Sequence, residues 1–269
     1  MTLPIGEILC GDALEIMRTW PDSSIDMIFT DPPYGHNNNN GDLIHKREAA
    51  LGRGPAGEAR AIANDGVEAN DLFRACLPEF KRLLKPDCCC CCCCCGGGGP
   101  DPQFARWSLW LDEVLTFKQM IVWDKGPMGM GWHYRRSYET VLVAHKGKKC
   151  RWYDETNKVE NIIRHIGKII PSASQHPTQK PEELASHFIR LHTQPGDVVL
   201  DPFCGSGSTL EACEREGRRW IGIDIDQHWC EVAYKRTRQQ GLFTAEDFSA
   251  LQPQHPAPQQ DGEHPQADS

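Results

Sequence analysis

The stretch TDPPYG, at positions 30–35, places a carboxylate, two prolines and a tyrosine directly after an apolar run. Neither Pro32 nor Pro33 has an N–H for a strand ladder, so the two prolines end the preceding strand and fix the direction of the nearby carbonyl groups. The Asp31 carboxylate, a rigid carbonyl oxygen and the flat ring of Tyr34 suit a planar group that bears an amino substituent. These residues favour a clamp for such an amine.

A second group of residues that could bind a ligand or do chemistry lies in DVVLDPFCGSGSTLEA (197–212) and in the later IGIDID. The first segment predicts a strand, a turn with Gly205 and Gly207, and a helix whose N-terminus favours an anion. Asp224 ends the next predicted strand, where a carboxylate can accept hydrogen bonds from ribose hydroxyls. Because GxGxxG is absent, a nucleoside that carries a carboxylate is favoured over a dinucleotide. An ordinary tight turn is the alternative.

Strand and helix patterns alternate around these two groups, and they predict an α/β fold with a doubly wound, mostly parallel sheet. Strands are expected at 5–9, 24–30, 118–124, 138–146, 197–201 and 219–226, with one more in the cysteine run. Helices are expected at 13–20, 70–86, 104–115, 208–216 and 227–239, and from position 181. Pro78 should kink or delay its helix, and Pro181 should be the first residue of its own. Ser208 and Glu211 predict a capping box, and Gly217 predicts the end of that helix.

Composition and charge narrow the class of protein. The chain has 269 residues, 39% of them hydrophobic, which suffices for a sizeable core. It contains no apolar run of transmembrane length and no signal-peptide pattern, so we expect a soluble, cytoplasmic protein with no membrane partner. The net charge of −8 is uneven, because residues 118–168 hold eleven Lys and Arg against five acidic residues. Such a basic segment suits contacts with phosphates.

Fourteen cysteines include eight in succession, Cys88–Cys95. Adjacent cysteines in a strand alternate between its two faces, and no CxxC pair with zinc spacing occurs outside the run. The favoured interpretation is a strand of small apolar side chains, and no metal site is predicted. A metal or redox role and a repeat-derived tract are the alternatives. Such a run favours a reducing compartment.

Four motifs in one chain resemble those of the S-adenosylmethionine (SAM)-dependent amino-methyltransferases of DNA, which methylate adenine N6 or cytosine N4. They are DPPY (31–34), HPTQKP (176–181), DPFCGSGST (201–209) and GIDID (222–226). The catalytic motif precedes the cofactor motif, with a basic stretch between them, which resembles the β class of this family.

The resemblance spans roughly residues 6–240 and implies a seven-stranded, Rossmann-like sheet in permuted motif order. It predicts one methyltransferase domain at 1–240, with a mobile loop at about 35–66 and a target-recognition segment at about 125–170. Residues 241–269, rich in Pro, Gln, Asp and His, are expected to form a disordered tail.

The resemblance also implies a mechanism. The Asp31 carboxylate and the Pro32 carbonyl would accept hydrogen bonds from the amino group of a flipped-out base, while Tyr34 stacks on the base and Pro33 holds the turn. The sulfonium methyl group would then transfer in line, through positioning and electrostatics rather than a covalent enzyme intermediate.

The resemblance implies further contacts. Asp224 would bind the ribose and Asp12 the adenine end of SAM, and Lys180 would lie near its carboxylate. The full set of expected cofactor residues is Asp12, Asp31, Thr178, Lys180, Asp201, Phe203, Gly205, Gly207 and Asp224. Basic residues that alternate with aromatic residues in the middle segment are candidates for DNA contacts. These are Arg135, Arg136, Lys146, Lys148 and Lys149. The alternative is a solvated basic loop.

Several alternatives stay open. DPPY favours adenine N6 over cytosine N4, for which SPPY is typical. Cytosine C5 methylation would use a Pro-Cys dipeptide, which is absent, and protein glutamine methylation uses NPPY with the cofactor motif first. An RNA substrate and an inactive SAM- or nucleic-acid-binding protein are further readings. Double-stranded DNA is the expected partner, and the recognition sequence, a homodimer and a cognate restriction enzyme are left open.

Overall fold

The computed structural model describes residues 2–34, 63–66, 68–94, 103–126, 137–167 and 180–240. Its strands are β1 (Glu7–Cys10), β2 (Ile25–Thr30), β3 (Leu84–Cys94), β4 (Thr116–Asp124), β5 (Tyr138–His145), β6 (Ile162–Ile163), β7 (Val198–Asp201) and β8 (Arg219–Asp224). Its helices are α1 (Ala13–Arg18), α3 (Ala69–Leu83), α4 (Gln103–Val114), α5 (Glu182–His192), α6 (Ser208–Arg215) and α7 (Gln227–Gln240). The expected tail, and all but 63–66 of the expected loop, lie outside the described residues.

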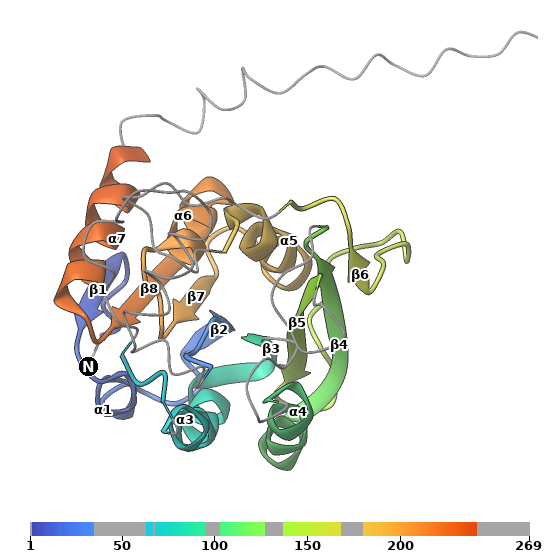
Figure 1. Ribbon diagram of the computed structural model, residues 1–269, viewed down its shortest axis with the longest axis horizontal. Helices are drawn as coiled ribbons and strands as arrows, with labels where there is room; N and C mark the ends of the chain where they lie inside the picture. Colours follow the sequence, from blue (N-terminus) through green and yellow to red (C-terminus); the bar gives the residue numbers. More distant parts are fainter. Residues whose placement is uncertain are drawn as a thin grey trace, which may run out of the picture.

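All described strands join one sheet in the order β1-β8-β7-β2-β3-β5-β4-β6 (Figure 1). The mostly parallel α/β sheet is confirmed, but it has eight described strands rather than seven, and the two-residue β6 has no sequence pattern of its own. β5 runs antiparallel to both β3 and β4.

Helices cover both faces of the sheet (Figure 1). The core on one face joins α1, α3 and α4 to Cys88, Cys90 and Cys92, whereas the other joins α5 and α6 to Cys89 and Cys91. Cys88–Cys93 thus lie in a buried strand, and their side chains alternate between two cores, as the sequence predicts. None of the described helices combines the length and apolar character that crossing a membrane requires.

The order in which the chain adds strands to the sheet reverses between the parallel neighbours β7 and β2. From β7 the chain continues through α6 to β8 on one side, and from β2 through α3 to β3 on the other. β7 and β2 pair in parallel, with Met27 opposite Val199. Ligands of open α/β sheets bind outside the carboxyl ends of the strands at such a switch point. This edge, here called the carboxyl edge, carries the residues that follow β2, β7 and β8.

Three helix boundaries differ from the sequence predictions. α3 begins at Ala69 and continues through Pro78, so the proline does not delay the helix. Burial of the Phe73, Leu77 and Phe80 face offsets the roughly 3 kcal/mol that an interior proline costs. Pro181 is the N-cap of α5 rather than its first residue.

The predicted capping box of Ser208 and Glu211 is wrong. The N-cap of α6 is Gly207, which has no side chain to cap the helix. Gly207 adopts φ +83°, and a Cβ there would lie 2.9 Å from the Cβ of Ala233 in α7. Close packing of α7 therefore decides this helix start. Gly217, with φ +70°, ends the helix as predicted.

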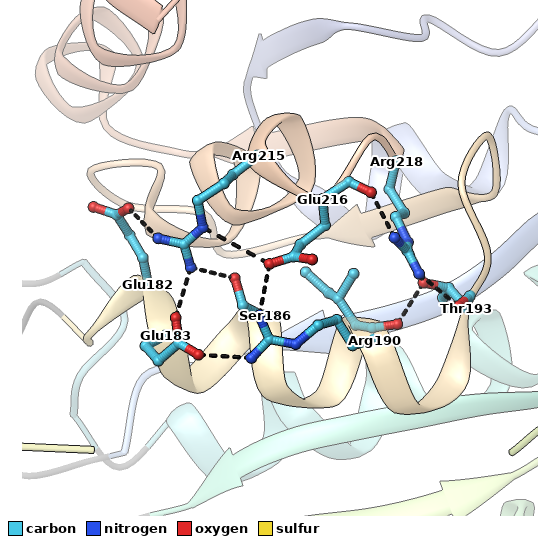
Figure 2. A network of polar contacts seen from close by, with 9 residues as sticks. Glu182, Glu183, Ser186, Arg190, Thr193, Arg215, Glu216 and Arg218 are labelled. Carbon is cyan, nitrogen blue, oxygen red and sulfur yellow. Dashed lines mark hydrogen bonds and ion pairs between the residues drawn. The ribbon is translucent and has the colours of Figure 1, made fainter. Parts of the chain in front are cut away.

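A network of ion pairs fixes α5 against α6 (Figure 2). The Arg215 guanidinium lies 2.9 Å from a Glu183 carboxylate oxygen and donates to Ser186 Oγ at 2.6 Å. Arg190 bridges Glu183 at 2.6 Å and Glu216 at 2.9 Å. Each exposed pair contributes about 0–1 kcal/mol, but shared partners restrict how the two helices can shift. The network thereby holds the helix that starts beside Lys180.

Candidate active site

Aspartates follow four neighbouring strands at the carboxyl edge. Asp31 follows β2, Asp201 and Asp224 end β7 and β8, and Asp12 lies two residues after β1. The Gly11 N–H donates to the Asp224 carbonyl at 2.9 Å, which holds the end of β1 against the end of β8. The parallel sheet thus brings together the sequence-predicted clamp and the sequence-predicted cofactor residues.

Among the described residues, two side chains bind the Asp31 carboxylate. Lys180 Nζ lies 2.6 Å from Oδ2, and the Tyr34 hydroxyl donates to Oδ1. The side chain of Asp31 is 25% exposed, and that of Lys180 is 11% exposed. Burial raises the pKa of Asp31, while the charge and hydrogen bond of Lys180 oppose the rise. Lys180 therefore helps Asp31 to remain an ionised acceptor.

Tyr34 is buried between the clamp and the core. The Lys180 ammonium lies 5.2 Å from the centroid over the face of its ring, and the Trp107 ring is 6.1 Å away. Its backbone N–H donates to Asp65 Oδ1 at 3.0 Å. Sequence reasoning missed Asp65, although Asn-Asp-Gly at 64–66 is a turn signal. The predicted stacking of Tyr34 on a base stays a prediction.

Sequence reasoning also missed Glu139, the second residue of β5. Its Oε2 lies 3.3 Å from Lys180 Nζ, and its Oε1 lies 2.7 Å from Nζ of Lys125. Burial would raise the pKa of Glu139, but the two lysines lower it to about 2. Glu139 is therefore ionised at neutral pH, and Lys180 is shared between Asp31 and Glu139. No local sequence pattern marks this acid.

Asp201 is 2% exposed and holds the turn after β7. Its Oδ1 accepts the N–H of Phe203 at 3.1 Å. Burial raises its pKa to about 7, against hydrogen bonds that favour the ionised form. This geometry indicates that Asp201 shapes the turn, and Phe203 in that turn is half-buried. Cys204 is buried in the same turn, as expected for a packing residue.

Asp224 and Asp12 both present carboxylate oxygens at the carboxyl edge. Asp224 accepts the N–H groups of Gly205 and Asp226 at 2.9 Å each and is half-buried. A carboxylate offers about four acceptor positions, so capacity remains for ribose hydroxyls. Asp12 caps α1 through one oxygen, which accepts the Glu15 N–H at 2.9 Å, and its side chain is also half-buried. These carboxylate acceptors suit the hydroxyl and amino groups of an adenosine.

The predicted DNA-contact residues divide into two groups. Arg135 and Arg136, together with the cofactor candidate Thr178, lie outside the described residues. Lys146, Lys148 and Lys149 follow β5 at the edge of the sheet opposite the clamp, because β5 is antiparallel to β3. Lys146 Nζ donates to the Leu84 carbonyl at 2.6 Å, which is a structural contact. Lys148 and Lys149 are exposed there, and their role in DNA contact stays a prediction.

Comparison with known proteins places the chain in a family. The chain belongs to the DNA methylase family N6_N4_Mtase, which matches residues 25–235. Among curated proteins, the type II methyltransferase M.HinfI of Haemophilus influenzae is 29% identical over 262 residues, covering 87% of this chain and 69% of that protein. The predicted family of amino-methyltransferases is thereby confirmed.

Two solved structures share the fold. M1.HpyAVI, solved as a complex with SAM, is 25% identical, with a TM-score of 0.60 over 86% of this chain and 98% of that chain. The cytosine-N4-specific PvuII DNA methyltransferase is 20% identical, with a TM-score of 0.66 over 87% of each chain. The Rossmann-like methyltransferase fold expected from the sequence is confirmed.

Proposed function

We propose that this chain transfers a methyl group from SAM to the exocyclic N6 of a flipped-out adenine in double-stranded DNA. One observation carries this proposal. The rigid turn 31–34 stands at the switch point of the sheet, and its acceptor Asp31 lies beside the cofactor-type ends of β7 and β8. Membership of the DNA methylase family and the DPPY sequence support the same reaction.

Asp224 and Asp12 bind the nucleoside part of the cofactor, and Phe203 lies against it. When bound, SAM supplies an electrophilic methyl group on a sulfonium sulfur. The chain then has to present an amino nitrogen to this methyl group in line and to exclude water from the site. Lys180 was expected near the cofactor carboxylate, but its contacts with Asp31 and Glu139 support a role at the clamp.

The clamp activates a nitrogen that is a poor nucleophile, because its lone pair is delocalised into the base. Asp31 and the Pro32 carbonyl accept the two amino hydrogens and draw the nitrogen toward a tetrahedral state. Asp31 is also the nearest acceptor for the proton that the alkylated nitrogen must lose. These acceptors act where positive charge develops, in a partly dry site.

Entry of the base requires an exchange at Asp31. Lys180 occupies one carboxylate oxygen and one face of the Tyr34 ring, the two places that the amino group and the base would take. Glu139 lies 3.3 Å from the same ammonium, so Lys180 can leave Asp31 and keep an ion pair. The free-energy cost of moving the charged lysine is lowered because it keeps Glu139 as a carboxylate partner.

Cytosine N4 is the second candidate substrate, because its amino group would meet the same acceptors. The shared fold with the PvuII cytosine-N4-specific enzyme is compatible with this alternative. DPPY rather than SPPY favours adenine. An inactive chain that binds SAM or nucleic acid without methyl transfer is the alternative from a different class.

The test is nucleoside mass spectrometry on DNA from a methylation-deficient bacterial host that expresses the chain. Asp31→Ala removes the acceptor, and Asp71→Ala is the matched control, since Asp71 is an exposed aspartate in the first turn of α3. We expect N6-methyladenine with the wild type and the control but not with Asp31→Ala. N4-methylcytosine would overturn the assignment of the base and keep the mechanism. A folded protein that binds SAM and yields neither product would overturn the proposed reaction.

A further inference from the structure

Three potential metal ligands meet far from the clamp. Cys89 lies on β3, Cys150 follows β5, and His192 is the last residue of α5. The Cys150 sulfur lies 3.7 Å from the Cys89 sulfur and 3.7 Å from Nδ1 of His192. All three ligand atoms lie within 4.8 Å of one another. Cys89 and His192 are buried, and Cys150 is half-buried.

These separations match those of a tetrahedral zinc site. With Zn–S near 2.3 Å and Zn–N near 2.0–2.1 Å, tetrahedral ligand atoms lie roughly 3.3–3.8 Å apart. Two of the three separations in the cluster already fall in that range, before any ion draws the ligands together. Thiolate and imidazole are also the ligand types that zinc prefers.

Two further residues border the cluster. Cys91 is on the same face of β3, with its sulfur 3.9 Å from that of Cys89. His145 lies directly opposite Cys89 in the β3–β5 ladder and is fully buried. Neither ring nitrogen of His145 has a hydrogen-bond partner among the described residues. Of the two, Cys91 is the candidate for a fourth ligand, because its sulfur lies beside that of Cys89.

Without an ion, the cluster is held by weak contacts. The hydrogen bond with Cys89 and burial raise the pKa of the Cys150 thiol, so it is neutral at physiological pH. His192 Nδ1 lies 2.9 Å from the Arg151 carbonyl oxygen, to which it can donate. An ion would displace the thiol protons and require the imidazole proton to lie on Nε2. Binding is therefore expected to release protons and to strengthen as pH rises.

We propose that Cys89, Cys150 and His192 bind one Zn²⁺-like divalent cation that has a structural role. The cluster lies toward the edge of the sheet opposite the clamp, where β2 begins, so the ion would not touch the reacting atoms. It would join β3, the segment after β5 and the end of α5. The opposite ends of β5 and α5 carry Glu139 and lie beside Lys180. This inference does not depend on the proposed methyl transfer.

The test is titration of the reduced, metal-free full-length protein with Co²⁺ under anaerobic conditions, followed by Zn²⁺ competition. We expect one Co²⁺ per chain, with the thiolate charge-transfer and tetrahedral d–d absorption of a sulfur-rich site, and displacement by one equivalent of Zn²⁺. Cys150→Ser and His192→Gln should each weaken binding by roughly 100-fold. Cys90→Ala is the matched control, because Cys90 is the neighbour of Cys89 on the other face of β3.

A second readout separates a specific site from loose binding by the cysteine run. Saturation with Zn²⁺ should raise the Tm of the wild type and of Cys90→Ala by roughly 5 °C, and that of Cys150→Ser far less. Circular dichroism before titration verifies that each variant is folded. Equal Co²⁺ affinity in Cys150→Ser, His192→Gln and wild type would overturn the proposal. So would several Co²⁺ per chain without tetrahedral absorption, or the loss of binding in Cys90→Ala alone.

Discussion

Asp26 and Asp31 stand near the two ends of the strand β2 and have contrasting surroundings. The Asp26 side chain is 3% exposed and accepts from Lys85 at 2.7 Å, from Arg151 at 3.0 Å and from the Val198 N–H at 3.1 Å. The Asp31 side chain is 25% exposed and shares Lys180 with Glu139. Among the described residues, Asp26 accepts from three donors and is nearly buried, whereas Asp31 accepts from two and is partly exposed.

The pKa values of Asp26 and Asp31 shift in opposite directions. Burial would raise the pKa of Asp26, but Lys85 and the Val198 N–H reverse the direction, and the pKa is lowered. Burial also raises the pKa of Asp31, and there Lys180 does not reverse it. A carboxylate with a lowered pKa stabilises the fold at neutral pH, whereas one with a raised pKa makes ionisation costly. The contrast separates a structural aspartate from the one that we propose accepts the amino group of the substrate.

The largest effect is expected from Asp31→Ala. Loss of the acceptor should lower the rate of methyl transfer by about 10³-fold, because an electrostatic contact made to the reacting nitrogen is removed. The free energy of unfolding should change little, since ionisation of Asp31 is unfavourable in the fold. Single-turnover methylation and urea unfolding of the same preparation measure both quantities. A large loss of stability with unchanged methylation would show that Asp31 is the structural aspartate and does not act in the reaction.

Asp26→Ala should act on stability instead. It leaves Lys85 and Arg151 without their buried partner, although each is about one-third exposed and stays partly hydrated. We expect the free energy of unfolding to fall by about 2–3 kcal/mol at pH 7. Methyl transfer well below the unfolding transition should stay near that of the wild type.

The difference in stability between the wild type and Asp26→Ala should depend on pH in a defined direction. Because the folded pKa of Asp26 is lowered, its stabilisation is present above the unfolded value of about 3.9 and is lost as pH falls through the folded value. The gap in stability between wild type and Asp26→Ala should therefore shrink below about pH 4. A gap that stays constant down to pH 3 would count against the ion pairs as its cause.

Lys180→Met removes the cation that opposes protonation of Asp31. The clamp works as a carboxylate, so methyl transfer should fall as pH decreases through the raised pKa of Asp31. Without Lys180 this acid limb should move to higher pH, and the rate near neutral pH should fall. Lys180→Arg, which keeps the positive charge, should return the acid side of the pH–rate profile to that of the wild type. If the KM for SAM rises instead and the limb does not move, Lys180 acts on the cofactor.

Tyr34→Phe should have the smallest effect. It removes the hydroxyl that donates to Asp31 and keeps the ring, which predicts a loss of about two- to tenfold in methyl transfer. Tyr34→Ala should cost far more if the ring stacks on the base. Equal rates for the two variants in a single-turnover assay would show that the ring has no such role.

Much of the fold could be predicted, because burial imposes local patterns. The apolar run 25–30 lies in the fully buried β2, and the cysteine run forms β3 because small apolar side chains can face two cores at once. Helix ends were predicted less well. Gly207 begins α6 because Ala233 approaches it from a helix much later in the chain, and no local pattern encodes that contact.

The sequence by itself determined the rigid turn of Pro32 and Pro33 and the carboxylates at the strand ends. Prolines end strands, and parallel strands bring their carboxyl ends to one edge, whatever the rest of the chain does. Only the tertiary structure decided that Lys180, 149 positions away in the chain, would bind Asp31 and that Glu139 would share it. It likewise gathered Cys89, Cys150 and His192. Contacts between distant side chains depend on how the elements pack, and local residue patterns do not specify that packing.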